Sequence, residues 1–93
     1  MGVVIHSNAC IGENCIIAQQ VTIGGRSKQK NVPRIGNNVY IGAGAKVLGD
    51  ISVGDDVVIG AGAVVIKSVE ANCAVAGVPA KLIREGITMQ ELV

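Results

Sequence analysis

The chain is short and nearly neutral: it has 93 residues, 13 glycines and a formal net charge of +1, with one tyrosine and no tryptophan or phenylalanine. This length allows one small domain, whose core cannot draw on aromatic bulk. The charge excludes the basic surface that binds nucleic acid or an anionic membrane. The sequence has no apolar run long enough to cross a bilayer and no basic leader typical of a signal peptide, so we expect a cytoplasmic protein.

Few side chains can carry chemistry. The three cysteines, Cys10, Cys15 and Cys73, are odd in number and lack CxxC spacing, which argues against a disulfide framework or a zinc site. We therefore expect reduced thiols, some of them packed as small apolar residues, and no metal.

A six-residue repeat runs through most of the chain. Counting in sixes from Ile5, nearly every position is aliphatic, Gln29 being the failure, and a second small or aliphatic residue follows four places later. The first set is Ile5, Ile11, Ile17, Ile23, Ile35, Ile41, Val47, Val53, Ile59 and Val65. A helical period of 3.6 cannot keep such a pattern on one face. The six-residue repeat therefore predicts short strands and tight turns stacked as a solenoid.

The units IGENCI, IGNNVY, IGAGAK, VGDDVV and IGAGAV resemble the hexapeptide repeat of left-handed parallel β-helix proteins, over roughly residues 4 to 76. The resemblance implies an all-β fold, a left-handed parallel β-helix of about four triangular coils with three hexapeptides to a coil. The hand is opposite to the usual crossover and comes from the resemblance alone. We expect the β-helix domain over residues 1–76, with a loop at 25–34. An exit loop and a short capping helix from about Thr88 are expected over 77–93.

Residues eighteen apart would then lie above one another. This spacing predicts two interior stacks: Ile5, Ile23, Ile41 and Ile59, and Ile17, Ile35 and Val53. A short prism exposes flat sides and open ends, which favours association. Because proteins with this repeat are commonly trimers, we expect a C3 homotrimer, the alternative being a monomer capped at both ends.

The same spacing predicts a column of small residues on the outside of the prism. Two neighbouring positions read His6, Gly24, Gly42, Gly60 and Ser7, Gly25, Ala43, Ala61. A strip with almost no side chains lets a long, thin, amide-bearing ligand lie against the backbone and use its N–H and C=O groups. The alternative is that the glycines only satisfy turn geometry.

The segment AGVPAKLI, together with the doubled IGAGA and with VTIGG, resembles the C-terminal half of the hexapeptide acyltransferases, most closely the serine O-acetyltransferases. The resemblance implies acetyl-CoA as co-substrate, with its pantetheine arm in a groove between two prisms. The implied groove residues are Gly42, Ala43, Gly60, Ala61, Gly77, Val78 and Pro79, with Lys67, Lys81 and Arg84 as candidates for the phosphates. For any one cation, a solvated surface charge is the alternative. In the resembled family the loop at 25–34 helps to close the active site against the neighbouring subunit, the alternative being a plain surface excursion.

Acyl transfer from a thioester to a hydroxyl needs a base for the acceptor's proton and donors for the developing oxyanion. In the resembled family one catalytic His, assisted by an Asp, precedes the segment matching GVVI, and would fall before Met1. A second family His precedes the proline matching Pro33, where this chain has Val32. The one remaining imidazole, His6, is the candidate base, although it matches no catalytic position of the family.

Three functions follow as expectations. The first is transfer of acetyl from acetyl-CoA to a hydroxyl acceptor, serine or sugar-like. The others are a non-catalytic trimeric module that binds CoA or has a structural role, and a truncated acetyltransferase without its catalytic His. Carbonic anhydrases of the γ type share the prism, but their zinc needs three histidines and this chain has one. A sugar-nucleotide transferase would need an attached nucleotide domain, for which there is no sequence.

Overall fold

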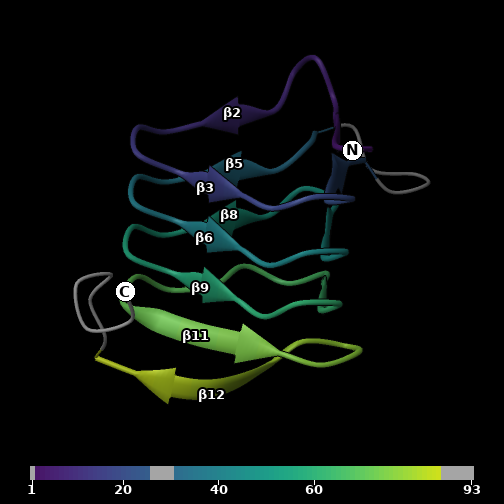
Figure 1. Cartoon of the computed structure of the whole chain (residues 1–93). Helices are drawn as coiled ribbons and strands as arrows, with labels where there is room; N and C mark the ends of the chain where they lie inside the picture. Colours follow the sequence, from purple (N-terminus) through teal and green to yellow (C-terminus); the bar gives the residue numbers. More distant parts are fainter. Residues whose placement is uncertain (1, 26–30, 87–93) are drawn as a thin grey trace.

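The computed structural model describes residues 2–25 and 31–86, which form a stack of short strands joined by tight turns (Figure 1). The strands are β1 (Val4–Ile5), β2 (Cys10–Ile11), β3 (Ile16–Ile17), β4 (Thr22–Gly24), β5 (Arg34–Ile35), β6 (Tyr40–Ile41), β7 (Lys46–Leu48), β8 (Ser52–Val53), β9 (Val58–Ile59), β10 (Val64–Val65), β11 (Cys73–Ala76) and β12 (Lys81–Glu85). Across these two described ranges no helix is long and apolar enough to span a membrane.

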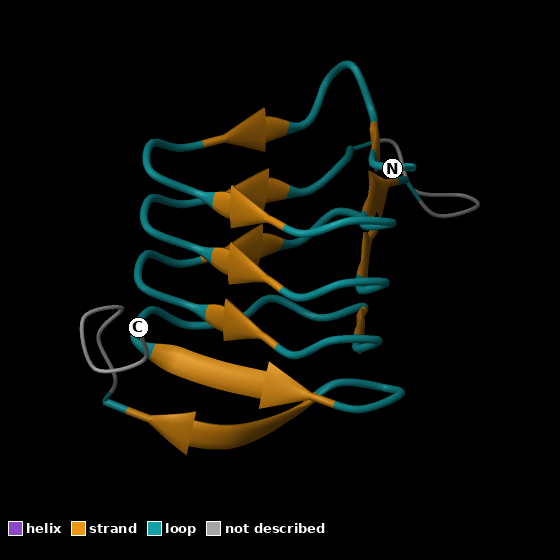
Figure 2. Cartoon of the chain, in the orientation of Figure 1, coloured by secondary structure: helices purple, strands orange, loops and turns teal. Residues whose placement is uncertain are grey.

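Three sheets form the sides of a triangular prism (Figure 2). One contains β1, β4, β7 and β10, the second β2, β5 and β8, and the third β3, β6, β9, β11 and β12. Neighbouring strands run parallel, except for β11 and β12, which pair antiparallel. The architecture is the predicted parallel β-helix.

The register corrects the predicted interior stacks. Ile17 pairs with Ile41, and Ile23 with Val47, each twenty-four positions on, because both pairs span the loop at 25–34. Elsewhere the spacing is eighteen, as between Ile41 and Ile59, except in the last coil, where Ile59 pairs with Val75, sixteen positions on. The loop therefore adds six residues between paired strands without adding a side to the prism. The six-residue repeat, counted along the sequence, had assigned these residues to one side. The observed columns are Ile5–Ile23–Val47–Val65, Ile11–Ile35–Val53 and Ile17–Ile41–Ile59–Val75.

The inside of the prism is the hydrophobic core, and it is built from aliphatic side chains. Ile23, Ile41 and Ile59 are fully buried, and the described residues include no buried polar side chain. The second inward position of the repeat is buried as predicted in the middle coils, at Val21, Val39, Ala45, Ile51, Val57 and Ala63. Each buried isoleucine or valine contributes about 2 kcal/mol relative to exposure, so stacked aliphatic layers replace the missing aromatic residues.

The turns between the second and third sheets explain a polar part of the repeat. Asn14, Asn38, Asp56 and Asn72 occupy equivalent positions with φ between 57° and 61°, a conformation that Asn and Asp tolerate better than most residues. One place earlier, Asp55 Oδ1 accepts a hydrogen bond of 2.7 Å from the N–H of Asn37. Asn37 Oδ1 in turn accepts one of 2.8 Å from the N–H of Glu13. The side chains thus satisfy turn donors of the coil above.

Asp55→Ala is expected to lower the free energy of unfolding by about 1–2 kcal/mol, because the N–H of Asn37 loses its acceptor. Asp55→Asn keeps an Oδ1 acceptor and should stay close to the parent chain. Urea unfolding followed by circular dichroism measures both. Equal losses in the two variants would show that the hydrogen bond is not the cause.

The chain leaves the prism differently from the expectation. Instead of an exit loop, residues 77–80 form a turn and β12 returns antiparallel along β11, with a register shift between Ala74 and Val75. The physical reason is that the residues described after β11 form no further coil, so the outer N–H and C=O groups of β11 need another partner. The capping helix expected from Thr88 lies outside the described residues, as do residues 26–30 of the predicted loop.

Candidate functional site

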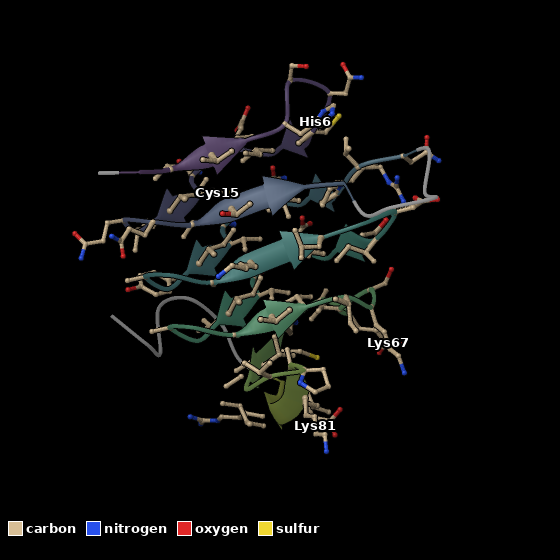
Figure 3. The ribbon with its side chains drawn as sticks, turned by 90° about the vertical axis from the view of Figure 1, so that its right-hand side faces the viewer. His6, Cys15, Lys67 and Lys81 are labelled. Atoms are coloured by element: carbon tan, nitrogen blue, oxygen red, sulfur yellow. The ribbon has the colours of Figure 1, made fainter. Side chains whose placement is uncertain are left out.

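Two edges of the prism carry the predicted site residues. We call the turns at residues 18–21, 42–45, 60–63 and 77–80 the glycine edge. The loop edge is formed by the turns at 6–9, 49–51 and 66–68 together with Gly25 and residues 31–33. The sheet of β1, β4, β7 and β10 lies between them. Figure 3 faces this sheet and shows His6 at one end of the prism, with Lys67 and Lys81 at the other.

The predicted single column of small residues is wrong. Gly24 pairs with Leu48, so His6 and Gly24 belong to the loop edge. Gly42 and Gly60 follow β6 and β9 and lie at the glycine edge. The cause is again the loop, which adds six residues between Gly24 and Gly42 without adding a side to the prism.

The glycine edge nevertheless assembles a strip of small residues. Backbone hydrogen bonds of 2.8 to 3.0 Å link successive turns: the N–H groups of Gly44, Gly62 and Val64 donate to the carbonyls of Gln19, Ala43 and Gly77. The small members at this edge are Ala18, Gly42, Ala43, Gly60, Ala61, Ala76 and Gly77. Sequence reasoning missed Ala18 and Ala76. Ala18 lies twenty-four positions before Gly42, across the loop, and Ala76 lies sixteen positions after Gly60, because the last coil is two residues shorter.

Gly42 itself has a packing role. A Cβ placed on Gly42 would lie 2.5 Å from the backbone nitrogen of Ala61, and one on Gly60 would lie 3.1 Å from the Cβ of Ala76. Gly42 is buried, whereas Ala43 is half-buried and Ala61 is exposed. The glycine at 42 therefore allows the coils to stack, and Ala43 and Ala61 are the members that offer a surface.

The turn after β11 extends the strip toward the end of the prism. The carbonyl of Gly77 accepts from the N–H of Val64 at 3.0 Å, and the N–H of Ala80 donates to the carbonyl of Val64 at 2.8 Å. These bonds tie the turn to β10, and Val78 and Pro79 at its tip are exposed. The structure thus places the turn that carries the predicted groove residues beside Val64, at the glycine edge.

The three candidate phosphate ligands are not brought together. Lys81 begins β12 beside the turn at 77–80, whereas Lys67 belongs to the loop edge. Arg84 pairs with Ala74, further along β12 and away from the glycine edge. Among these cations, Lys81 alone lies next to the strip.

His6 does not have the geometry of a base for this strip. It is exposed on the first coil at the other edge, and its Nδ1 accepts a hydrogen bond of 3.0 Å from the N–H of Asn8. In the neutral ring the proton is then on Nε2, which leaves that nitrogen without a lone pair for an incoming proton.

A polar cluster at the loop edge was not predicted. Arg34 Nη1 lies 3.1 Å from Asp50 Oδ1, and its Nη2 donates to Ser52 Oγ at 2.9 Å. Hydrogen bonds from Asn31 and from Arg34 lower the pKa of Asp50 below its ordinary value. The cluster anchors the chain where it re-enters the prism, and Arg34 and Ser52 are eighteen positions apart, which is a usable signal.

The described part of the chain has no group of three His, Cys, Asp or Glu residues that would hold a metal ion. Its cysteines are free: Cys10 is exposed, Cys15 is partly buried and Cys73 is buried. Burial raises the pKa of the Cys73 thiol, and the carboxylates of Glu85 and Glu70 raise it further.

Residues 33–67 match the family of bacterial hexapeptide transferases with six repeats. A serine acetyltransferase of Synechococcus elongatus is 50% identical over 95 residues, which cover 99% of this chain and 39% of that protein. The chain belongs to the hexapeptide transferases. A Staphylococcus aureus serine acetyltransferase is 47% identical over 91% of the chain and 41% of its own length.

A solved structure shows that the similarity to serine acetyltransferases extends from the sequence to the fold. Serine acetyltransferase from Brucella abortus strain S19, in complex with coenzyme A, superposes with a TM-score of 0.86 at 48% identity, over 91% of this chain and 35% of that chain. The fold is the left-handed parallel β-helix that the resemblance implied. The chain spans about two-fifths of the length of the curated relatives that it matches.

Proposed function

We propose that this hexapeptide transferase transfers the acetyl group of acetyl-CoA to the hydroxyl of serine. The observation that carries the proposal is the strip of small residues at the glycine edge, in a chain whose solved relative binds coenzyme A. Pantetheine is long, thin and bears two amides, so it suits a surface where no side chain beyond a methyl group intervenes. Lys81, beside the strip, would meet a phosphate as a charge-assisted donor.

We propose further that the binding groove is completed by a second copy in a homotrimer. Ala43 and Ala61 lie at a convex edge of the prism, so one chain supplies a single wall of a groove. Val4 and Ile16, on two flat sides, are 60% and 49% exposed, which favours burial against another subunit. Free cysteines fit a reducing compartment, and we propose the cytoplasm.

The second candidate is a module that binds coenzyme A without transfer. It is favoured by Val32, which stands where the resembled family has a catalytic His, and by the position of His6 at the other edge of the prism. Between residues 2 and 25 and between 31 and 86 there is no other imidazole to serve as the base.

Both candidate functions require that the strip binds coenzyme A, and isothermal titration with coenzyme A tests this binding. Ala61→Leu should weaken binding at least about tenfold, or about 1.4 kcal/mol, because a larger side chain fills the strip. Ala71→Leu changes another exposed alanine, in the turn between the second and third sheets, and should leave affinity unchanged. A folded parent chain that does not bind, or equal effects of the two variants, would refute the binding strip.

The reaction itself separates the two candidates. Release of free coenzyme A from acetyl-CoA in the presence of serine is expected for the transferase and not for the binding module. His6→Ala should leave any such activity unchanged, because His6 Nδ1 already accepts the N–H of Asn8 and Nε2 carries the proton of the neutral ring. Loss of activity in this variant, with coenzyme A affinity retained, would restore His6 as a base.

A further inference from the structure

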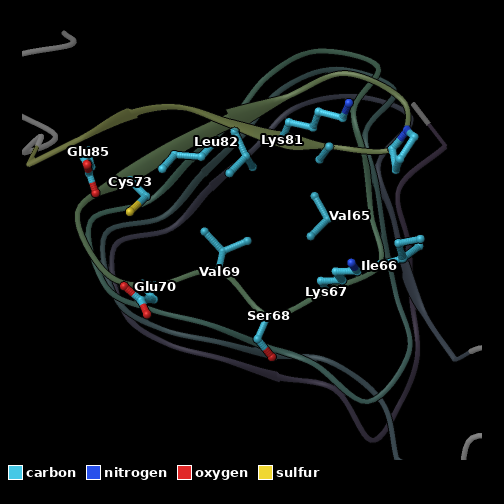
Figure 4. A pocket seen from close by; sticks show the side chains of 13 residues that line it. Val65, Ile66, Lys67, Ser68, Val69, Glu70, Cys73, Lys81, Leu82 and Glu85 are labelled. Carbon is cyan, nitrogen blue, oxygen red and sulfur yellow. The ribbon is translucent and has the colours of Figure 1, made fainter.

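Among the residues that the structure describes, none covers the C-terminal end of the prism. This end forms an apolar cup, the end cup, which we define as the pocket lined by residues 65–70, Cys73, Val75, 79–82 and Glu85 (Figure 4). Its volume is about 540 Å³. Val65, Val69 and Leu82 supply much of its apolar lining. Leu82 and its neighbour Ile83 are 54% and 66% exposed. A solenoid whose last coil is uncovered in this way needs a cover over its apolar interior.

The charged side chains that line the end cup are separated by sign, and Arg84 of β12 is not among the lining residues. Figure 4 shows Glu70 and Glu85 on one side of the cup, with Lys67 and Lys81 on the other. In the described part of the chain the one ion pair joins Arg34 to Asp50, so these four groups are not paired with one another. Strand β12 runs from Lys81 to Glu85, from the basic side to the acidic side.

Strand β12 is also a free edge. It is the terminal strand of its five-stranded sheet, and among the described residues only β11 pairs with it. All five of its residues are exposed. An edge strand presents a row of unpaired N–H and C=O groups that another strand can join. A charge at the centre of an edge strand normally protects it, whereas the centre of β12 is Leu82 and Ile83.

One two-fold axis satisfies all three features. An axis perpendicular to β12, in the plane of the open end, turns a second copy so that its β12 runs antiparallel to the first. The same rotation places the basic side of one cup opposite the acidic side of the other, and apolar lining opposite apolar lining. The surface is therefore complementary to itself, as an isologous interface requires.

We propose that two copies of this chain associate end to end through the end cup, with β12 antiparallel to β12 of the second copy. Lys67 and Lys81 of each copy face Glu70 and Glu85 of the other. This contact uses the end of the prism, so it is separate from the flat sides, and it would double whatever particle the flat sides form.

The test is the mass of the full chain in solution, by light scattering after gel filtration. Lys67→Glu with Lys81→Glu, and separately Glu70→Lys with Glu85→Lys, put like charges opposite each other and should halve the mass. Mixing these two double variants should restore it, and so should one chain carrying all four changes. Glu13→Lys, an exposed charge in a turn away from the cup and off the flat sides, serves as the control and should leave the mass unchanged.

Circular dichroism confirms that each variant is folded before its mass is compared. High salt should weaken the association of the parent chain, because the facing charges are screened. A parent mass equal to that of the double variants would overturn the proposal. A mass that falls in both double variants and is not restored by mixing would do so too.

The test also separates other occupants of the end cup. If residues 87–93 covered the end cup, a variant that ends at Gly86 would associate into a larger particle than the parent chain. Charge reversal would then leave the mass of the parent chain unchanged. This outcome would reject the proposal. If a small ligand filled the cup, none of the masses would change, with the same consequence. Coenzyme A affinity is not the readout, so the two proposals fail independently.

Discussion

Gly42→Ala is expected to lower the free energy of unfolding by about 3 kcal/mol, near the upper end for overpacking a core. The added Cβ would lie 2.5 Å from the backbone nitrogen of Ala61 and 2.8 Å from its Cα. Backbone cannot rotate away as a side chain can, so two coils must separate locally. Urea unfolding followed by circular dichroism measures the loss.

Gly24→Ala is the matched control, because Gly24 follows the same kind of hexapeptide isoleucine. A Cβ on Gly24 meets no atom of the described residues within 4 Å. This variant should be as stable as the parent chain or more stable by about 0.5 kcal/mol, since alanine reduces the entropy of the unfolded chain. Similar stabilities of the two variants would refute the packing role of Gly42.

The second large effect is expected for Ile23→Ala, at about 4 kcal/mol, within the range for removing most of a buried isoleucine. Ile23 is fully buried and lies between Ile5 and Val47 in its column. In a solenoid each layer is stabilised mainly by the layers directly above and below it. The loss is a large part of the 5–15 kcal/mol, roughly, that stabilises an ordinary domain, so Ile23→Ala should shift the urea midpoint strongly.

Ile5→Ala provides the comparison within the same column. Ile5 is 40% exposed and is covered by Ile23 on one side. Its loss should be about half as large, about 2 kcal/mol, because fewer contacts and less buried area disappear. If the two variants unfold at the same urea concentration, stability is not distributed by layers as the column implies.

The sequence pattern was sufficient to identify the repeat and its inward positions. Ile41 and Val57 occupy the two inward positions of their units, and both are fully buried. This works because a side chain in a short strand or tight turn points in or out according to local backbone geometry, which each hexapeptide carries in itself. The hand of the coils is not a local property, and it came from the resemblance to known proteins.

The pattern could not say which hexapeptides lie above one another. The segment at 25–33 keeps the six-residue phase whether it forms a side of the prism or leaves it, and only the hydrogen bonds between coils distinguish the two cases. Ile23 pairs with Val47 rather than with Ile41, and this one difference moves His6 to a different edge from Gly42. The predicted column that joined His6 to Gly42 is therefore wrong.

By itself, then, the sequence determined the solenoid, the burial of its aliphatic positions and the small residues that the acetyl-CoA proposal needs. Only the tertiary structure decided the register between coils, the strip at the glycine edge and the return of β12 along β11. The reason is that periodicity records which face of a strand is buried, whereas register and edge pairing depend on hydrogen bonds between segments far apart in the chain. The end cup arises from such a pairing, between Cys73–Ala76 and Lys81–Glu85.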